Sequence, residues 1–159
     1  MEIKVGMADL NVCKSPDSII TMGLGSCIGV VLYDPVIKVC GMVHIMLPDS
    51  TQISRNSNLA KFADTGIEEC LKRVVEIGAR KERLIAKIAG GAQMFSVNVN
   101  SPTLNVGERN AAACKQKLKD LNIRLVAEDT GGKYGRTVTF YPETGEYQIR
   151  AIGKETKSI

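Results

Sequence analysis

A cysteine at position 27 follows a glycine-rich stretch, TMGLGSCIGV at 21–30, where a loop is expected to lead into an apolar strand. A cysteine thiol becomes a strong nucleophile once its proton is removed. Gly23, Gly25 and Ser26 can hold unusual backbone angles, so that their N–H groups and that of Cys27 converge on a developing oxyanion. This pattern is typical of acyl-transfer chemistry. A buried structural cysteine at the start of a strand is an equally good interpretation of the pattern alone.

His44 is the only histidine in the chain, and its ordinary pKa suits proton transfer near neutral pH. It lies in VCGMVHIML at 39–47, the strand expected after that of Cys27, and a hairpin between them brings the two side chains within reach. In an arbitrary protein, a half-buried strand histidine bonded to backbone is the commoner case. A hydrolase based on Ser26 and His44 is less favoured, because the chain has no GxSxG elbow and thiols need less activation than hydroxyls.

The chemistry is expected to need neither a metal nor a cofactor. The five cysteines are odd in number and include no CxxC pair, which argues against a zinc site and a disulfide framework; they are Cys13, Cys27, Cys40, Cys70 and Cys114. The AGGAQ segment at 89–93 lacks the lysine of a P-loop, and GLGSC at 23–27 lacks the third glycine of a dinucleotide fingerprint. Nucleotide binding is therefore not supported.

Hydrophobic patterns predict about eight strands and two helices, an α+β or mixed fold with helices covering sheet faces. The expected strands lie at 2–6, 18–23, 27–34, 39–47, 83–91, 123–129, 136–142 and 146–153. The expected helices lie at 59–78 and, with a weaker pattern, at 108–121. Loops of small and polar residues are expected to border one cleft; they lie at 23–27, 48–58, 89–93, 96–110 and 129–135.

The chain of 159 residues fits one domain, expected over 1–153, followed by a polar tail at 154–159 that is expected to be flexible. Its net charge of +4 is dispersed and only 4% of its residues are aromatic, which argues against nucleic acid as a partner. No apolar run reaches the roughly 18 residues that cross a bilayer, so membrane insertion is not expected. The N-terminus has no signal-peptide pattern, which predicts a cytoplasmic protein.

Several blocks of the sequence, taken together, resemble the chemoreceptor glutamine deamidase family, CheD. They follow the order of the family over nearly the whole chain, and they are TMGLGSC at 21–27, GMVHIMLPDS at 41–50, KFADTGI at 61–67, KIAGGAQMF at 87–95, NVGERN at 105–110 and AEDTGG at 127–132. The resemblance implies a protein-glutamine deamidase that converts glutamines of methyl-accepting chemotaxis receptors to glutamate and releases ammonia.

The resemblance also implies the roles of individual residues. Cys27 is the expected nucleophile that forms a thioester, His44 the general acid and base, and Thr21 the residue that orients His44. Spacing alone does not single out Thr21, because a threonine at the end of an apolar strand is common. The backbone around Ser26 and Gly25 is expected to support the oxyanion.

The fold implied by the resemblance has two packed mixed sheets with helices on the outside, in α/β/β/α layers, similar to the catalytic domain of the cytotoxic necrotizing factor toxins. The partner implied besides the receptors is CheC, a phosphatase of the response regulator CheY.

Two other functions are open at this point. The same Cys27 and His44 can hydrolyse receptor glutamyl methyl esters, because both reactions pass through a tetrahedral intermediate and a thioester. Alternatively, the chain is a non-catalytic regulatory module that binds receptors and the CheC phosphatase.

Overall fold

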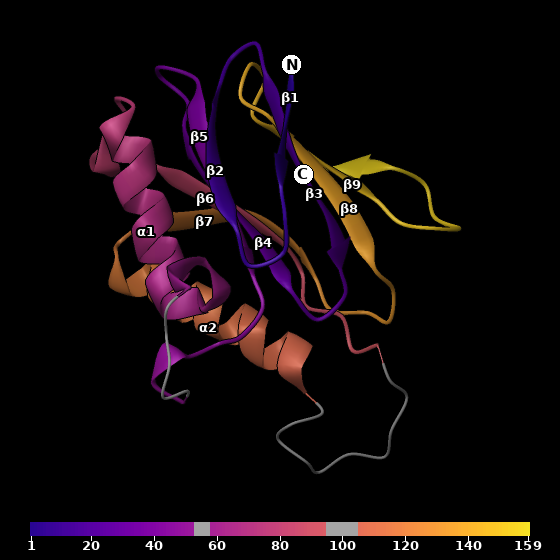
Figure 1. Ribbon diagram of the computed structural model, residues 1–159. Helices are drawn as coiled ribbons and strands as arrows, with labels where there is room; N and C mark the ends of the chain where they lie inside the picture. The colour runs from indigo at the N-terminus through magenta and orange to yellow at the C-terminus, as the bar shows by residue number, and fades with distance from the viewer. Residues whose placement is uncertain (53–57, 95–104) are drawn as a thin grey trace.

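Two five-stranded mixed sheets pack face to face in a computed structural model that describes residues 1–52, 58–94 and 105–159 (Figure 1). The loops expected at 48–58 and 96–110 therefore lie partly outside the described residues. The outer sheet has the order β1 (Glu2–Val5), β3 (Ser18–Leu24), β8 (Arg136–Tyr141), β9 (Glu146–Arg150) and β10 (Lys157–Ser158). The central sheet has the order β2 (Leu10–Lys14), β5 (Val39–Ile45), β4 (Ile28–Asp34), β6 (Ile85–Gly90) and β7 (Arg124–Thr130).

Each sheet combines one parallel pair with antiparallel pairs. The parallel pairs are β1 with β3 and β6 with β7. The β4–β5 hairpin turns at 35–38, and the β8–β9 hairpin turns through Gly145, whose φ of 80° favours glycine. The predicted α+β class with two packed mixed sheets is thus confirmed.

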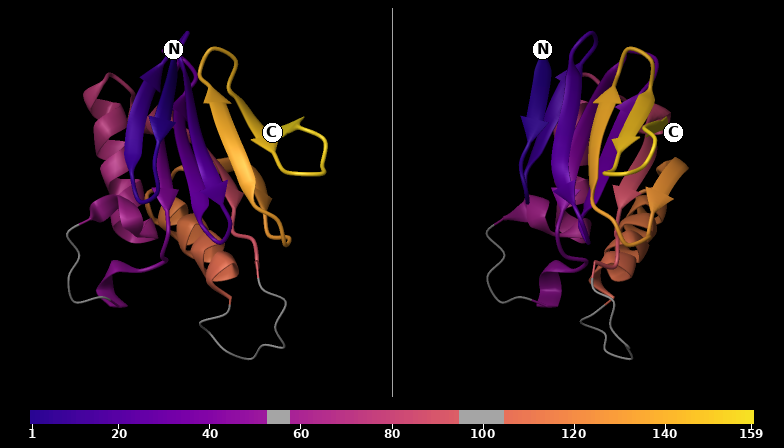
Figure 2. Two further views of the ribbon diagram at one scale, coloured as in Figure 1. Left: turned by 45° about the vertical axis from the view of Figure 1, so that its right-hand side comes forward. Right: turned by 90° about the vertical axis from the view of Figure 1, so that its right-hand side faces the viewer.

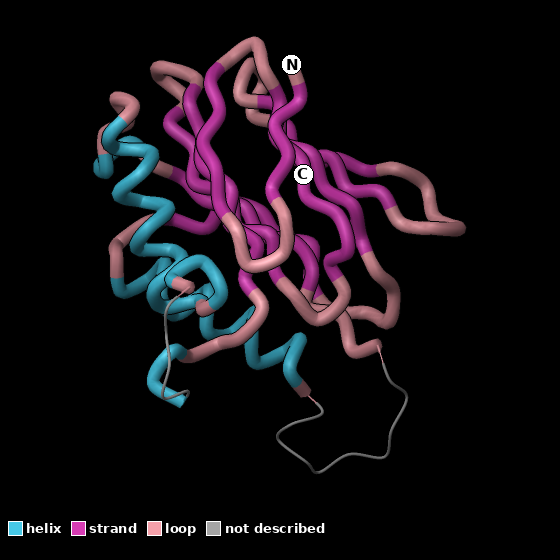
Figure 3. Tube along the Cα trace, in the orientation of Figure 1, coloured by secondary structure: helices cyan, strands magenta, loops and turns pink. Residues whose placement is uncertain are grey.

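Both helices lie against the central sheet, so the architecture is α/β/β and not the expected α/β/β/α (Figure 2). Helix α1 (Ala63–Glu76) packs on β5 and β2, and α2 (Val106–Asp120) packs on β4, β6 and β7. The reason is the connectivity: α1 links β5 to β6 and α2 links β6 to β7, so both connections stay with one sheet. Figure 3 shows the strands of the outer sheet lying away from both helices.

The central sheet is buried on both faces. Every residue of β4 and β5 is buried, as expected for strands covered by helices on one side and a second sheet on the other. The pattern of 39–47 predicts alternating faces, with Cys40 and Met42 on one and Val39, Val43 and Ile45 on the other. The structure confirms this: the second set faces the helices and the first faces the outer sheet. No described helix is long and apolar enough to span a membrane.

Two short edge strands were not expected from the sequence. Strand β2 alternates too weakly to be recognised, and it is stabilised by antiparallel pairing with β5. Strand β10 lies in the segment expected to be a flexible tail. Lys157 and Ser158 pair with β9, and Ile159 and Tyr147 exchange two backbone hydrogen bonds. The tail is corrected accordingly: it completes the edge of the outer sheet.

The remaining boundaries agree with the predicted helices to within one turn. The residues expected to open the first helix form a 3-10 turn, Leu59–Lys61, and α1 starts at Ala63. Two further 3-10 turns lie at Ser50–Gln52 and Lys81–Arg83. Gly78, expected to end α1, has a φ of 112° and donates its N–H to the Val75 carbonyl.

A buried ion pair holds the end of β4 that lies away from the glycine-rich loop. The Asp34 side chain is 0% exposed and accepts from Arg83 Nε and from the N–H groups of Arg80 and Val36. Burial alone would raise the pKa of this carboxyl. The Arg83 hydrogen bond and the two backbone N–H groups outweigh burial, so the pKa is lowered.

We expect Asp34→Asn to lower the free energy of unfolding by about 3 kcal/mol, because it leaves the Arg83 charge without its carboxylate. Since the folded-state pKa is lowered, this stabilisation is complete above the unfolded pKa of about 4 and is lost as pH falls through the folded value. Urea unfolding at pH 7 and at pH 3 measures both. Glu82→Gln is the control: Glu82 is 73% exposed, and its loss should cost less than about 1 kcal/mol.

Candidate active site

Cys27 and His44 lie on neighbouring strands and on the same face of the central sheet. Cys27 immediately precedes β4, and the β4–β5 register places Gly29 opposite His44 and Ile28 opposite Ile45. Continuing this register, Cys27 and His44 are diagonal neighbours, a spacing that side chains can bridge. Both residues face the outer sheet, and the expected hairpin between their segments is present.

Thr21 reaches His44 from the other sheet. The Thr21 Oγ1 atom lies 2.7 Å from His44 Nδ1 and donates to the Val5 carbonyl at 2.8 Å. The single hydroxyl proton is committed to Val5, so Thr21 accepts from an Nδ1–H of His44. This assignment from hydrogen-bond partners leaves Nε2 of the neutral ring unprotonated. Among the described residues, His44 Nε2 is a buried atom without a hydrogen-bond partner.

Burial drives both members of the pair toward their neutral forms. The His44 side chain is 0% exposed, and burial lowers its pKa. Cys27 is 7% exposed, and burial raises the pKa of its thiol. At neutral pH the resting pair is therefore a thiol and a neutral imidazole whose free Nε2 can accept a proton. Such a pair acts by general-base removal of the thiol proton and needs no preformed thiolate.

Two glycines of the AGGAQ segment hold the backbone of the Cys27 loop. Gly91 N–H donates to the Cys27 carbonyl at 2.9 Å, and Ala92 N–H donates to the Gly25 carbonyl at 2.8 Å. Gly90 has a φ of 116°, and a Cβ there would lie 2.1 Å from the Cys27 carbonyl oxygen. Only glycine permits this approach. The AGGAQ segment, which was compared with a phosphate-binding loop in the sequence analysis, thus supports the backbone of the proposed nucleophile.

The backbone N–H groups expected to stabilise the oxyanion are not all able to donate to it. Gly25 N–H donates to the Gly23 carbonyl at 3.1 Å, so it is already used within the loop. Gly23 lies further from the thiol, within β3, so the N–H groups of Ser26 and Cys27 are the nearest remaining candidates for an oxyanion. Gly23 has the expected left-handed backbone, with a φ of 74°, whereas Gly25 does not. Gly25 instead avoids a close contact with Met94, whose Cγ would lie 3.2 Å from a Cβ at position 25.

Asn110 is a polar residue that contacts this site, and the sequence analysis did not single it out. Its Nδ2 donates to the Ser26 and Met46 carbonyls, both at 2.9 Å. The available signal was its place in α2, one turn before Cys114 and two turns before Leu118 on the buried face of the helix. A polar residue in an apolar stripe is either a partnered core residue or a functional one.

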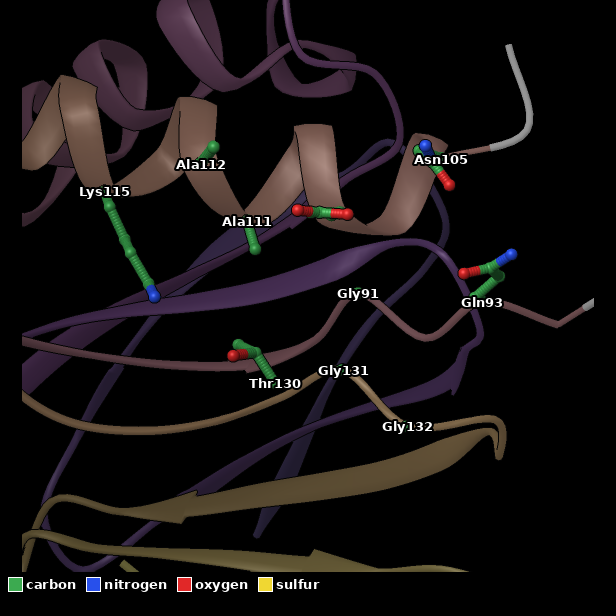
Figure 4. Close-up of a pocket in the computed structure, with 10 residues that line it drawn as sticks. Gly91, Gln93, Asn105, Ala111, Ala112, Lys115, Thr130, Gly131 and Gly132 are labelled. Atoms are coloured by element: carbon green, nitrogen blue, oxygen red, sulfur yellow. The ribbon is translucent and has the colours of Figure 1, made fainter. Parts of the chain in front are cut away.

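A pocket of about 420 Å³ lies beside the loop, between α2 and two glycine-rich segments (Figure 4). Its lining includes Gly91, Gln93, Lys115, Thr130 and Gly131. Cys27, His44 and Thr21 are not part of this lining. Gly91 connects the two regions, because its N–H supports Cys27. Of the loops considered for one cleft, 89–93 and 129–135 line this pocket and are joined by the Gln93 N–H bond to the Gly132 carbonyl, whereas 23–27 bonds 89–93 without lining the pocket.

The other four cysteines belong to the hydrophobic core. Cys70 and Cys114 face the central sheet from the helices, and burial raises the pKa of Cys70 to about 12 and that of Cys114 further. Cys13 and Cys40 are cross-strand partners between the sheets, and the hydrogen bond from Cys40 lowers the pKa of Cys13. Within the described segments, no group of three or more His, Cys, Asp and Glu side chains is arranged to hold a metal ion.

The Thr21 contact predicts a single tautomer for His44. Because the chain has only one histidine, ¹⁵N imidazole NMR reports this ring without overlap. We expect an Nδ1–H signal with an unprotonated Nε2, and a pKa below the ordinary value of 6.5 because of burial.

Thr21→Val removes the acceptor and should shift the ring toward the Nε2–H tautomer. Thr139→Val, a buried threonine of β8, is the matched control and should leave the spectrum unchanged. A predominant Nε2–H form in the wild type would contradict the hydrogen-bond assignment.

Comparison with known proteins identifies the family. The family model described as CheD chemotactic sensory transduction matches residues 46–151. A protein of Lachnoclostridium phytofermentans is 60% identical over 99% of this chain and 98% of its own length. Another, of Caldanaerobacter subterraneus subsp. tengcongensis, is 57% identical over 99% of this chain and 97% of its own. Both carry the name probable chemoreceptor glutamine deamidase CheD. Matched by this family model and by full-length relatives of that name, the chain belongs to the CheD family.

Proposed function

We propose that this chain deamidates glutamine side chains of chemoreceptors, with Cys27 as nucleophile and His44 as general acid and base. The observation that carries the proposal is the Thr21–His44 hydrogen bond, which leaves an unprotonated Nε2 on the sheet face that His44 shares with Cys27. The name of the relatives supplies the substrate class, since they are named for chemoreceptor glutamines.

Acylation begins when His44 Nε2 accepts the Cys27 thiol proton as sulfur attacks the glutamine Cδ. The carbonyl oxygen becomes an oxyanion, to which the N–H groups of Ser26 and Cys27 are the available donors. His44 then returns the proton to the amide nitrogen, the C–N bond breaks and ammonia leaves. The product is a thioester between the former glutamine and Cys27.

Deacylation uses the same groups in the reverse order. His44 Nε2 removes a proton from water, the hydroxide attacks the thioester carbon, and the C–S bond breaks. The proton returns to the sulfur, and the side chain leaves as glutamate. The balance is one water consumed and one ammonia released, with no change in oxidation state and with a neutral thiol and imidazole restored.

The burial of the pair indicates how substrate enters. Because His44 is 0% exposed and Cys27 is 7% exposed, the glutamine reaches the pair through the exposed part of Cys27. This excludes bulk water from the ring that moves the proton and strengthens its electrostatic interactions. The CheC partner expected from the family resemblance and the cytoplasmic location expected from the N-terminal sequence stay predictions.

Intact mass of a receptor cytoplasmic fragment tests the reaction. After incubation with the wild-type protein we expect a gain of about 1 Da for each glutamine converted, and none with Cys27→Ala or His44→Ala. Cys114→Ala is the matched control, because Cys114 is buried in the helix-side core and should leave the gain unchanged.

Other results of the same experiment separate the alternatives. A loss of about 14 Da from a methylated fragment identifies methyl ester hydrolysis by the same thiol. Binding without a mass change, together with a Cys27 alkylated no faster than the core cysteines, supports a regulatory module and rejects the catalytic proposal.

The pH dependence follows from the lowered pKa of His44. The imidazole must be neutral to accept the thiol proton, so kcat/KM should fall only as pH drops through a value below 6.5. Initial rates of ammonia release between pH 4.5 and pH 8 measure this limb. An acid limb centred above 6.5 would mean that a group other than the buried His44 controls the reaction.

A further inference from the structure

The amide of Asn110 joins the two chain segments that carry Cys27 and His44. Asn110 lies on α2 and is 0% exposed, and both hydrogen bonds recorded for it come from Nδ2. One goes to the carbonyl of Ser26, the residue before Cys27. The other goes to the carbonyl of Met46, two residues after His44. One planar group therefore fixes both segments at once.

The contact falls where the ladder between β4 and β5 ends. The last paired residues at this end are Ile28 and Ile45. Beyond them Ser26 leads into the glycine-rich loop, and Met46 leads to the 3-10 turn before α1, where its N–H donates to the Lys61 carbonyl. A strand pair that has lost its ladder partners is free to separate. The amide of Asn110 replaces the next ladder bond and prevents that separation.

The orientation of the amide is determined by its surroundings. With the amide reversed, Oδ1 would face two carbonyl oxygens, which only a donor can satisfy. In the orientation present, Oδ1 is buried without a hydrogen-bond partner among the described residues. A buried unsatisfied oxygen costs stability. This cost is accepted where the two N–H groups of the amide hold the backbone of the Cys27 segment and of the His44 segment together.

Tight packing holds the helix that presents the amide. A Cβ at Gly107, one turn before Asn110, would lie 2.4 Å from the Ala92 carbonyl oxygen. Ala92 in turn donates its N–H to the Gly25 carbonyl. Helix α2 therefore contacts the Cys27 loop directly through Asn110 and indirectly through the AGGAQ segment, so two routes fix the amide against this loop.

We propose that Asn110 is a positioning residue of the active site, which fixes the separation of the Cys27 thiol and His44 Nε2. This inference rests on the proposed function. Proton transfer and attack require alignment within fractions of an ångström, and small displacements lower the rate far more than they lower binding. Loss of the amide is therefore expected to affect kcat more than KM.

The experiment compares Asn110→Ala with Cys114→Ala on the same helix. We expect kcat for the receptor fragment to fall at least about tenfold in Asn110→Ala with KM changed less than about twofold. Cys114→Ala, equally buried but directed into the helix-side core, should lower thermal stability and leave kcat within about twofold of wild type. Equal kcat in the two variants, at equal folded fraction, would overturn the proposal.

Alkylation of Cys27 provides a second readout that does not depend on deamidation. The rate of iodoacetamide modification, measured by peptide mass spectrometry with the four core cysteines as internal references, should fall at least about threefold in Asn110→Ala at pH 7. An unchanged rate contradicts the positioning role even if the wild type proves to have no deamidase activity. A wild type without Cys27-dependent deamidation, but with the altered alkylation rate, rejects the proposed function and retains the positioning role.

Asn110→Ser is the second variant if Asn110→Ala does not fold. Its hydroxyl keeps a single donor, so it can bond one of the two carbonyls and not both. We expect a kcat between those of the wild type and Asn110→Ala, or at least about threefold below the wild type where Asn110→Ala cannot be measured. Wild-type kcat in a folded Asn110→Ser would show that joining both segments is unnecessary.

Discussion

The hydrogen bond between Thr21 and His44 crosses from the outer sheet to the central sheet, and the proposed chemistry depends on the spacing that allows it. Cys27 and His44 come from the central sheet alone, so Thr21 can orient the ring only if the sheets pack closely at this point. Gly29, opposite His44, permits that approach, because a Cβ there would lie 2.7 Å from the Tyr147 hydroxyl. Tyr147 also donates to the Gly29 carbonyl. The complete sandwich is therefore part of the site.

Most of the family's sequence blocks serve the backbone around this contact and do not supply reacting groups. The AGGAQ segment bonds the Cys27 loop, and the DTGG segment bonds it in turn, since Gly131 N–H donates to the Gly90 carbonyl. The blocks at 41–50 and 61–67 are joined by Asp64 of α1, which accepts from the N–H and the hydroxyl of Ser50. Gly90 and Gly91 allow backbones to approach where no side chain fits, whereas Gly131 provides a left-handed backbone with a φ of 88°. The three proposed functional side chains thus depend on backbone contacts from segments that lie far apart in the sequence.

The sequence predicted the hairpin that carries Cys27 and His44 better than it predicted the elements around that hairpin. The alternation in 39–47 placed His44 on the same face as Cys40 and Met42, because a fully buried strand still alternates between two cores, and the structure shows that this face lies toward the outer sheet. The edge strands β2 and β10 were missed, since both depend on a neighbouring strand and not on their own pattern. The four-layer arrangement was wrong because amphipathic helices indicate that a sheet is covered but not which one. The role of Thr21 was predicted only from the family resemblance. The role of Asn110 could be inferred only once the structure placed its amide between the carbonyls of Ser26 and Met46.

Burial sets the electrostatic character of the proposed site. It raises the pKa of Cys27 and lowers that of His44, so both effects oppose a resting thiolate–imidazolium pair. In the transition state the situation differs, because the negative charge passes to the substrate oxygen, where backbone N–H groups can stabilise it, while the imidazolium forms beside the Thr21 oxygen. A site that disfavours separated charges in the resting state and stabilises them during attack lowers the free energy of the transition state relative to that of the resting state. The same burial keeps the thiol protonated until a substrate arrives, which protects it from oxidation, since the thiolate is the reactive form.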